Sequence, residues 1–350
     1  MSAAGQPLLA VEDLRVAFNT EDGLVQAVDG VSFSLGAGEI LAVVGESGCG
    51  KSVTAMTLLG LTRSPNARFE GTARFRDTEL VSASDEELRR VRGAQIAMIF
   101  QDPMTALNPV YRIGAQIVEQ IQAHEEVSDA QALDRTVEML ERVGIPRARD
   151  RLRSYPHEFS GGMRQRVMIA MALSCSPSVL IADEPTTALD VTIQAQILEE
   201  IKKLRAEEGA GVILVTHDLG VVADIADRVV VMYAGRVVEE GTLDEIFYDP
   251  QHPYTWGLLG SIARLDRDRP DRLPAIAGLP PSLSDRPQGC HFRPRCPHEF
   301  DRCPSVPPLE ARQPEAPNHR DRCWLEVADK KRLREVEGQI GLGAKEVSAS

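Results

Sequence analysis

The chain lacks the long apolar runs of a membrane-spanning protein. Runs such as residues 179–182 and 212–215 are far shorter than the roughly 20 apolar residues that a helix needs to cross a bilayer. The N-terminus also lacks the basic segment and apolar core of a secretory signal. We therefore expect a soluble, cytoplasmic chain, whose contact with any membrane runs through another protein.

The chain also has no excess of basic residues. The 350 residues include 39 Lys and Arg but 52 Asp and Glu, which gives a net charge of -13. Proteins that bind nucleic acid without sequence preference usually carry a basic face, so we expect no nucleic-acid partner. The remaining composition, 43% hydrophobic and 26% charged, is that of a globular chain long enough for two domains.

Short apolar runs alternate with helical patterns up to about residue 240. Four runs are almost continuously apolar, as expected of strands buried on both faces of a parallel sheet. They are residues 40–44, 96–100, 179–182 and 212–215. Residues 8–18 and 24–35 instead mix polar and apolar side chains on either side of Asp22-Gly23, which predicts an antiparallel hairpin. Together these patterns indicate an α/β fold with an antiparallel edge.

A helical insertion interrupts the α/β pattern between about residues 103 and 177. Its clearest helix is predicted over 128–143, because Ser128 and Gln131 can form a capping box and Gly144 stops the helix. The apolar face of this helix is predicted to consist of Ala130, Leu133, Val137, Leu140 and Val143.

The composition changes after residue 240. Prolines and Asp/Arg pairs accumulate, and strand patterns disappear. We therefore predict an α/β domain over residues 8–240, a separate loop-rich C-terminal extension over 241–328, and a polar tail over 329–350 that frays or is disordered.

A glycine-rich loop follows the first buried run and precedes a helical run. In such a loop, backbone N–H groups converge on phosphate oxygens in conformations that a Cβ would block. The Lys51 ammonium is expected at the β and γ phosphates of ATP, and the Ser52 hydroxyl is expected on Mg²⁺. The loop supplies the candidate ATP-binding residues Gly45, Ser47, Gly48, Cys49, Gly50, Lys51 and Ser52.

Two carboxylates follow the third buried run. Ligands of open α/β sheets bind at the carboxyl ends of the strands, where Asp183 and Glu184 stand. We expect Asp183 to hold Mg²⁺ together with Ser52, and Glu184 to polarise the water that attacks the γ phosphate.

A third motif introduces a family resemblance. The segment Phe159-Ser160-Gly161-Gly162-Met163-Arg164-Gln165 resembles the signature of ATP-binding-cassette (ABC) transporter ATPases, and Gln101, Asp190 and His217 match the remaining motifs of that family in order. The resemblance implies a P-loop NTPase with an antiparallel β subdomain, a helical insertion and a C-terminal extension. It also implies ATP hydrolysis by two cassettes that face each other head to tail.

The resemblance assigns further roles by residue. Ser160, Gly161, Gly162 and Gln165 would close over the ATP of the partner subunit, and Asp190 would belong to the loop between the two subunits. Within its own site, Phe18 would stack on adenine, and Gln101 would contact Mg²⁺ or the water. His217 would contact the γ phosphate and, with Glu184 and Gln101, complete the catalytic set. Val53, also placed at ATP, replaces a residue whose hydroxyl often contacts the α phosphate.

Longer segments around two of the motifs resemble one branch of this family in particular. Residues 155–166 and 101–109 resemble the dipeptide and oligopeptide permease branch, as do His252-Pro253-Tyr254 and the segment from Gly289 to Pro297. That branch implies a second ATPase subunit, commonly a paralogue, two membrane permease subunits, and an extracytoplasmic peptide-binding protein. A groove near residues 101–111 would receive a short permease helix, which would hold the chain on the cytoplasmic face of the membrane. The alternatives are an importer of nickel or another small solute, and a soluble ABC ATPase.

Four of the six cysteines crowd into the C-terminal extension. Cys290, Cys296, Cys303 and Cys323 are separated by five, six and nineteen residues, without the close pairs of a zinc ribbon. Four thiolates equally suit a 4Fe-4S cluster. A segment this small, with few apolar residues, needs a bound metal group or a cross-link because its own core would be too small. The resemblance to the peptide-importer branch favours the cluster; the alternatives are zinc, and unligated thiols or disulfides.

Overall fold

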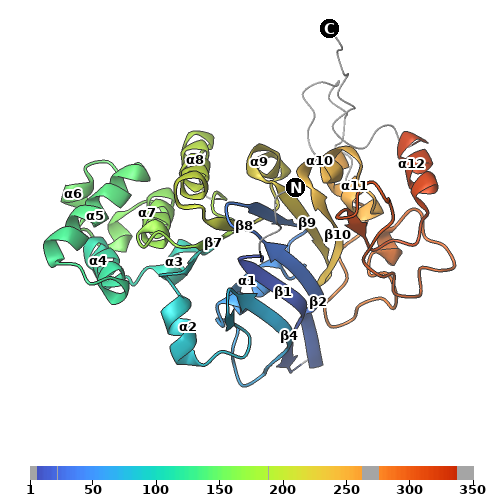
Figure 1. Cartoon of the computed structure of the whole chain (residues 1–350), viewed down its shortest axis with the longest axis horizontal. Coiled ribbons are helices and arrows are strands. Elements are labelled where there is room, and N and C mark those ends of the chain that lie inside the picture. Colours follow the sequence, from blue (N-terminus) through green and yellow to red (C-terminus); the bar gives the residue numbers. More distant parts are fainter. Residues whose placement is uncertain (1–5, 22, 188, 262–275, 337–350) are drawn as a thin grey trace, which may run out of the picture.

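Two β-sheets form the framework of the chain. A computed structural model describes residues 6–21, 23–187, 189–261 and 276–336. The larger sheet has the strand order β11-β12-β10-β9-β3-β8-β7-β6, and the smaller has the order β2-β1-β4-β5 (Figure 1). Within the described residues, no helix is both long and apolar enough to span a bilayer.

The centre of the larger sheet is parallel and buried. It consists of β3 (Ile40–Val44), β6 (Ile96–Ile99), β7 (Val179–Asp183), β8 (Gly211–Thr216) and β9 (Arg228–Tyr233). Every residue of the first four strands is buried, so the prediction from the four continuous apolar runs is confirmed. The antiparallel β10 (Arg236–Thr242), which pairs with β9, was not predicted.

The smaller sheet is antiparallel. The predicted hairpin is formed by β1 (Leu9–Thr20) and β2 (Gly23–Leu35), with Thr20 opposite Gly23. Asp22 of the predicted turn lies outside the described residues. Sequence patterns missed β4 (Ala67–Phe75) and the short β5 (Thr78–Glu79). The helix α1 (Lys51–Leu58) shares one apolar core with β1, β2 and the parallel strands.

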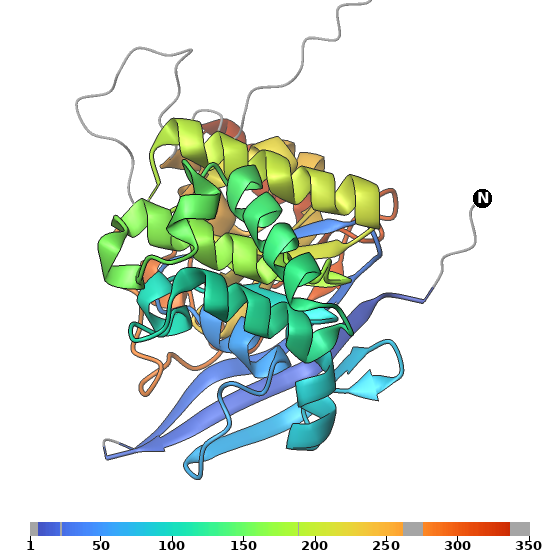
Figure 2. The ribbon, with the colours of Figure 1, turned by 90° about the vertical axis from the view of Figure 1, so that its left-hand side faces the viewer.

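The insertion consists of short helices that lie together at one end of the molecule (Figures 1 and 2). They are α3 (Pro103–Ala106), α4 (Ile113–His124), α5 (Asp129–Arg142), α6 (Ala148–Arg151), η1 (Pro156–Glu158) and α7 (Gly161–Leu173). Their buried side chains join those of β6, β7 and the long α8 (Val191–Glu208) in a second core. The remaining helices before the extension are α2 (Asp85–Val91) and α9 (Leu219–Ile225).

The predicted capping box of α5 is present, but its predicted apolar face is partly wrong. The Ser128 hydroxyl accepts from the Gln131 N–H, and the Gln131 side chain accepts from the Ser128 N–H. Ala130 and Leu133 are exposed. The buried line instead includes Thr136, whose hydroxyl donates to a carbonyl one turn earlier, so a polar residue marks the inner face.

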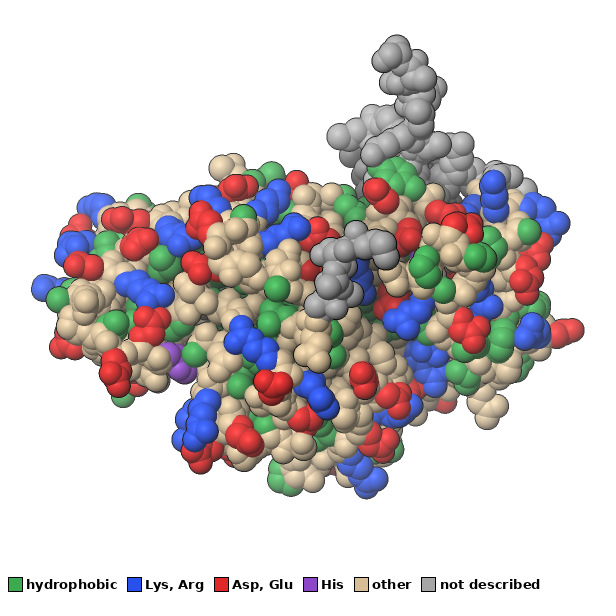
Figure 3. Space-filling view, in the orientation of Figure 1, with side chains coloured by type: hydrophobic (Ala, Val, Ile, Leu, Met, Phe, Trp, Pro, Cys, Tyr) green, Lys and Arg blue, Asp and Glu red, His purple; other side chains and the backbone are tan. Residues whose placement is uncertain are grey.

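The C-terminal extension continues the larger sheet, contrary to the expectation that strands end after residue 240. β12 (Arg320–Asp321) pairs with β10, and β11 (Glu310–Ala311) pairs with β12. The extension also contains α10 (Leu243–Tyr248), α11 (Pro253–Gly260), the turn η2 (Arg293–Arg295) and α12 (Val327–Val336). On the face seen in Figure 3, acidic and basic side chains are interspersed over the core and the extension alike.

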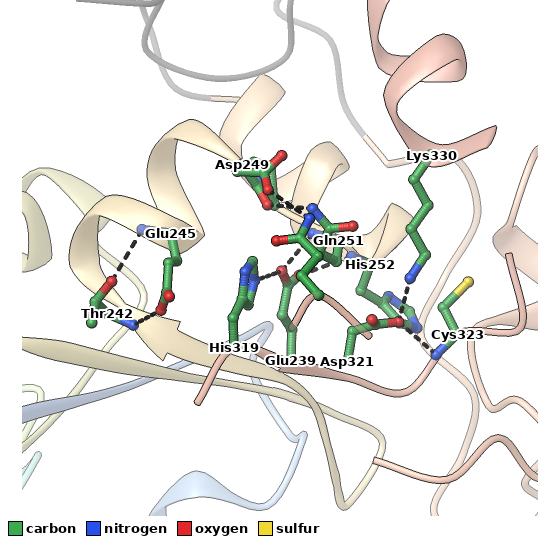
Figure 4. A network of polar contacts seen from close by, with 12 residues as sticks. Glu239, Thr242, Glu245, Asp249, Gln251, His252, His319, Asp321, Cys323 and Lys330 are labelled. Carbon is green, nitrogen blue, oxygen red and sulfur yellow. Dashed lines mark hydrogen bonds and ion pairs between the residues drawn. The ribbon is translucent and has the colours of Figure 1, made fainter. Parts of the chain in front are cut away.

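A buried polar network fastens the extension to β10 (Figure 4). The Glu239 carboxylate accepts hydrogen bonds from the backbone N–H groups of Gln251 and His252, and its Oε1 lies 2.8 Å from Nε2 of His319. Asp321 pairs in the same region with Lys330 of α12, at 2.6 Å. Since these groups are almost completely buried, each needs its partner to offset the loss of hydration.

Replacing His319 with Gln is expected to destabilise the fold by about 3 kcal/mol at pH 6, because it removes the charge that faces Glu239. Burial alone would lower the pKa of His319, but the hydrogen bond and charge of Glu239 outweigh it and hold the pKa above its usual value. A raised pKa stabilises the fold fully below the unfolded value of about 6.5, and this contribution is lost as the pH rises through the folded pKa. The cost of the substitution should therefore shrink by pH 9.

Urea unfolding followed by tryptophan fluorescence measures this cost, because Trp256 and Trp324 both lie in the extension. The matched control is Arg332→Gln, which breaks an exposed pair with Asp329 and should cost no more than about 0.5 kcal/mol at either pH. An equal loss at pH 6 and pH 9 for His319→Gln would contradict the assigned charge.

Candidate nucleotide-binding and catalytic site

The predicted site residues follow three neighbouring parallel strands. In the sheet, Val44 at the end of β3 lies opposite Thr216 of β8, and Asp183 at the end of β7 lies opposite Val215 of β8. The carboxyl ends of these strands therefore share one edge. This register brings the glycine-rich loop, Glu184 and His217 to one place, although they are far apart in the sequence.

Glycine is required at two positions of the loop. Gly45 has φ +150°, and a Cβ there would lie 2.2 Å from the carbonyl oxygen of Met232. Gly50 has φ +101°, and its Cβ would lie 2.5 Å from the carbonyl oxygen of Ala27. The loop can therefore pack against these strands only if both residues lack side chains.

Lys51 begins α1 and turns back over the loop. Its side chain is buried, and Nζ donates to the carbonyl oxygens of Gly45 at 2.7 Å and Glu46 at 3.1 Å. The Cys49 side chain points into the core, where burial raises the pKa of its thiol, so this residue can offer a ligand only its backbone. Ser47 and Gly48 form the exposed tip of the loop.

Two further residues are predicted to contact ATP. Val53 and Phe18 are both half-buried and pack against the core that contains α1 and β1. Their predicted contacts with ATP stay predictions.

Two of the three predicted Mg²⁺ ligands, Ser52 and Asp183, are in contact. Asp183 is buried, and burial raises the pKa of its carboxyl group, opposed by a hydrogen bond from the Ser52 hydroxyl. Its Oδ1 has no hydrogen-bond partner within the part of the chain that the structure describes. A buried carboxylate oxygen with a free coordination position beside a hydroxyl suits Mg²⁺ or a water molecule of its shell.

Glu184 gathers the remaining candidate catalytic residues. Its Oε1 lies 3.1 Å from Nδ1 of His217, and its Oε2 accepts hydrogen bonds from Nε2 of Gln101 at 3.3 Å and from the Thr187 hydroxyl at 3.0 Å. Glu184 has φ +48°, an uncommon backbone conformation that is held by a hydrogen bond from its N–H to the Val215 carbonyl. The contact of Thr187 with Glu184 was not predicted, although a hydroxyl side chain three residues after Glu184 could have indicated it.

The signature segment lies at the start of a helix. Ser160 is the N-cap of α7, and its hydroxyl accepts from the N–H of Met163 at 3.3 Å. Ser160 and Gly161 are exposed and Gly162 is half-exposed, so the N-terminal N–H groups of α7 are open to an anion. Asp190 caps α8 in the same way, through the N–H of Ile193.

Gln165 does not share this exposed surface. Its side chain is fully buried, and its amide nitrogen donates to the carbonyl oxygen of Pro185. It lies on the inner side of α7, so the structure gives it an internal contact that ties α7 to the segment after Glu184. Its predicted contact with a partner's ATP stays a prediction.

The four C-terminal cysteines converge. Cys290, Cys296, Cys303 and Cys323 all line one small cavity, together with aromatic side chains such as Phe292. Burial raises the pKa of Cys296 and of Cys323 to about 12 each. No three His, Cys, Asp or Glu side chains among the described residues are arranged to hold a single metal ion.

Comparisons with known proteins identify the family of the chain. The family model described as "ABC transporter" matches residues 28–187, and the model "Oligopeptide/dipeptide transporter, C-terminal region" matches residues 238–303. The oligopeptide transport ATP-binding protein OppD of Salmonella typhimurium is 54% identical over 307 residues, which are 88% of this chain and 91% of that protein. The dipeptide transport ATP-binding protein DppD of Bacillus subtilis is 52% identical over 322 residues, 92% of this chain and 95% of that protein.

Solved structures give the same result for the fold. A dimeric post-hydrolysis state of the ATP-binding cassette MJ0796, bound to ADP and Pi, aligns with a TM-score of 0.62 and 26% identity, covering 67% of this chain and 98% of that one. The predicted fold class and the predicted ATPase activity are thereby confirmed. The roles of single residues stay predictions.

Replacing Asp183 with Asn is expected to weaken binding of ADP about tenfold in the presence of Mg²⁺, since a neutral amide is a poorer ligand for the ion. In EDTA the affinity for ADP should stay close to that of wild type. Isothermal titration calorimetry under both conditions measures the two effects. The matched control is Asp224→Asn on α9, which removes the exposed ion-pair partner of Lys202 on α8. This variant should bind ADP as tightly as wild type does. An equal loss for Asp183→Asn in EDTA would contradict the magnesium role.

Proposed function

The chain belongs to the ABC transporter family, in the branch of oligopeptide and dipeptide transport ATP-binding proteins, and on this premise we propose that it is the ATP-hydrolysing subunit of a peptide importer. The observation that carries the proposal is the meeting of Gln101, Glu184 and His217 beside the phosphate loop. The peptide as cargo is supported by the names of the relatives and by the match to the C-terminal region of peptide transporters.

Within its own site the chain binds and positions ATP. The loop N–H groups and Lys51 hold the phosphates. Ser52 and Asp183 would hold Mg²⁺, which when bound would neutralise negative charge on the phosphates. Glu184 then orients and polarises the attacking water. Gln101 and His217 contact the Glu184 carboxylate and keep it at the end of β7.

The second half of the proposal concerns a neighbouring subunit. Ser160, Gly161 and Gly162 offer an exposed anion site at the start of α7, and we assign it to the ATP of a partner cassette. The dimeric state of the similar cassette supports this assignment. We propose that the partner is a paralogous ATPase subunit, so that each chain contributes one half of two composite sites.

The membrane contact runs through the insertion. Met104 and Tyr111, which flank the exposed Val110, are large apolar side chains left on the surface directly after Gln101. An exposed apolar group of this kind suits a protein partner. We propose that this group receives a short cytoplasmic helix of one of the two permease subunits, which places the chain on the cytoplasmic face of the membrane. The extracytoplasmic peptide-binding protein acts on the other side of the membrane.

For the cysteines we propose a 4Fe-4S cluster with a structural role. Four thiols that face one cavity fit the donor set of such a cluster, in which each cysteine ligates a different iron. A bound metal group would also deprotonate thiols that burial otherwise keeps neutral.

Replacing Glu184 with Gln should slow ATP hydrolysis by at least about 100-fold, because the amide cannot polarise the water. ATP binding should be retained, and the ATP-bound cassettes should stay associated. Phosphate release and size-exclusion chromatography with ATP measure the two effects. Glu208→Gln, at the exposed end of α8, should hydrolyse ATP at the wild-type rate. Unchanged turnover in Glu184→Gln would rule out the role assigned to this residue.

Iron is expected in the chain purified without oxygen, with a broad visible absorbance. Cys296→Ser should lower both the iron content and the absorbance, whereas Cys175→Ser, a buried cysteine outside the extension, should leave both unchanged. Metal analysis by mass spectrometry decides the question. Zinc in place of iron would refute the cluster.

A further inference from the structure

The phosphate loop is held at Glu46 by two residues of the C-terminal extension. The Glu46 N–H donates to the Tyr254 hydroxyl at 2.8 Å. Its carboxylate accepts two parallel hydrogen bonds from the Arg295 guanidinium, Nη1 to Oε2 at 2.5 Å and Nη2 to Oε1 at 2.9 Å. Both residues lie in the 238–303 segment that matches the peptide-transporter C-terminal region, whereas the loop lies in the cassette.

Arg295 is itself fixed from several sides. Its Nε donates to the Ala277 carbonyl at 2.9 Å, and Nη2 also donates to the Ile276 carbonyl at 3.3 Å. Nη1 lies 3.3 Å from the Tyr233 hydroxyl, and the guanidinium carbon lies 5.8 Å from the centre of the Tyr233 ring. The Arg295 side chain is only 5% exposed. The guanidinium of Arg295 is therefore held in one orientation, unlike that of a mobile arginine on the surface.

Tyr254 is held with equal firmness. It is fully buried on α11, and its ring lies 4.6 Å from the Tyr233 ring and 5.4 Å from the Phe292 ring. Tyr233 ends β9, the strand whose residue Met232 touches the loop at Gly45. The aromatic group of Tyr233, Tyr254 and Phe292 therefore connects the loop, β9 and the extension in one packed unit.

The charge of Glu46 explains why the loop needs this support. Glu46 lies five residues before Lys51, in a loop that binds a polyanion, and an unpaired carboxylate there would repel the phosphates of ATP. Pairing with Arg295 neutralises the carboxylate and turns it toward the extension. The Glu46 carbonyl oxygen at the same time accepts a hydrogen bond from the Lys51 ammonium. The position of Glu46 therefore also affects where the phosphate-binding charge of Lys51 lies.

We propose that Arg295 and Tyr254 are positioning residues for ATP: the extension holds Glu46, and through it sets the conformation and charge of the phosphate loop. The inference rests on the nucleotide-binding role assigned above to residues 45–52. Neither residue touches the reacting atoms, so their loss should affect the binding of nucleotide rather than the chemical step.

Arg295→Ala is expected to weaken binding of ADP to the full chain about tenfold, equivalent to about 1.4 kcal/mol. Calorimetry with Mg²⁺ and ADP measures this effect. In the assembled transporter the same substitution should raise the KM for ATP and leave kcat within about twofold of wild type. Adding Glu46→Gln to Arg295→Ala should restore most of the affinity, because the uncharged side chain no longer repels phosphate. A purely structural role for Arg295 would allow no such rescue.

The matched control is Arg320→Ala, which removes another arginine of the extension from a glutamate outside the phosphate loop, Glu240 of β10. It should bind ADP as wild type does. Arg295→Lys keeps the charge but not the two parallel hydrogen bonds, so it should lose affinity by a smaller factor than Arg295→Ala, and it carries the test if the alanine variant does not fold.

Wild-type affinity for ADP in folded Arg295→Ala or Arg295→Lys would overturn the inference, as would a double variant no better than Arg295→Ala alone. Failure of the wild-type chain to bind ADP would instead overturn the proposed function, so the two failures are distinguishable.

Discussion

The parallel pairing of β3, β8 and β7 is the constraint on which the rest of the structure depends. These strands are completely buried, so a one-residue shift of their register would exchange the side chains that pack into the two cores on either side of the sheet. The same register fixes the distance between the phosphate loop, Glu184 and His217, which no local sequence feature could set. The packing of the cores and the geometry of the site therefore both depend on the register in which β3, β8 and β7 pair.

Much of this arrangement could be predicted from the chain itself. Buried parallel strands have continuous apolar runs, and the loop needs glycines at fixed positions, so both are visible in the sequence. The inner face of α5 was less visible, because Thr136 satisfies its hydroxyl within the helix and so can be buried. The internal position of Gln165 was also hidden, since a motif shows which residues recur together but not which side of a helix each one occupies.

The C-terminal extension was the hardest part to predict. Its strands are only two residues long, too short for a pattern, and its contacts depend on partners that are distant in the sequence, such as His319 with Glu239 and Arg295 with Glu46. The extension was expected to be a separate appendage because its composition differs from that of the cassette. The structure instead joins it to the cassette through sheet pairing, a buried ion pair and an aromatic group, and it reaches the phosphate loop.

The exposed start of α7 supports the proposal that one chain holds only half of each ATP site. The rate of ATP hydrolysis per chain, measured as the purified chain is diluted, tests this claim most directly. If Ser160 to Gly162 must reach the loop of another cassette, turnover per chain should vanish on dilution and return when the partner cassette is added. A turnover per chain that stays constant on dilution, without any partner, would contradict the account.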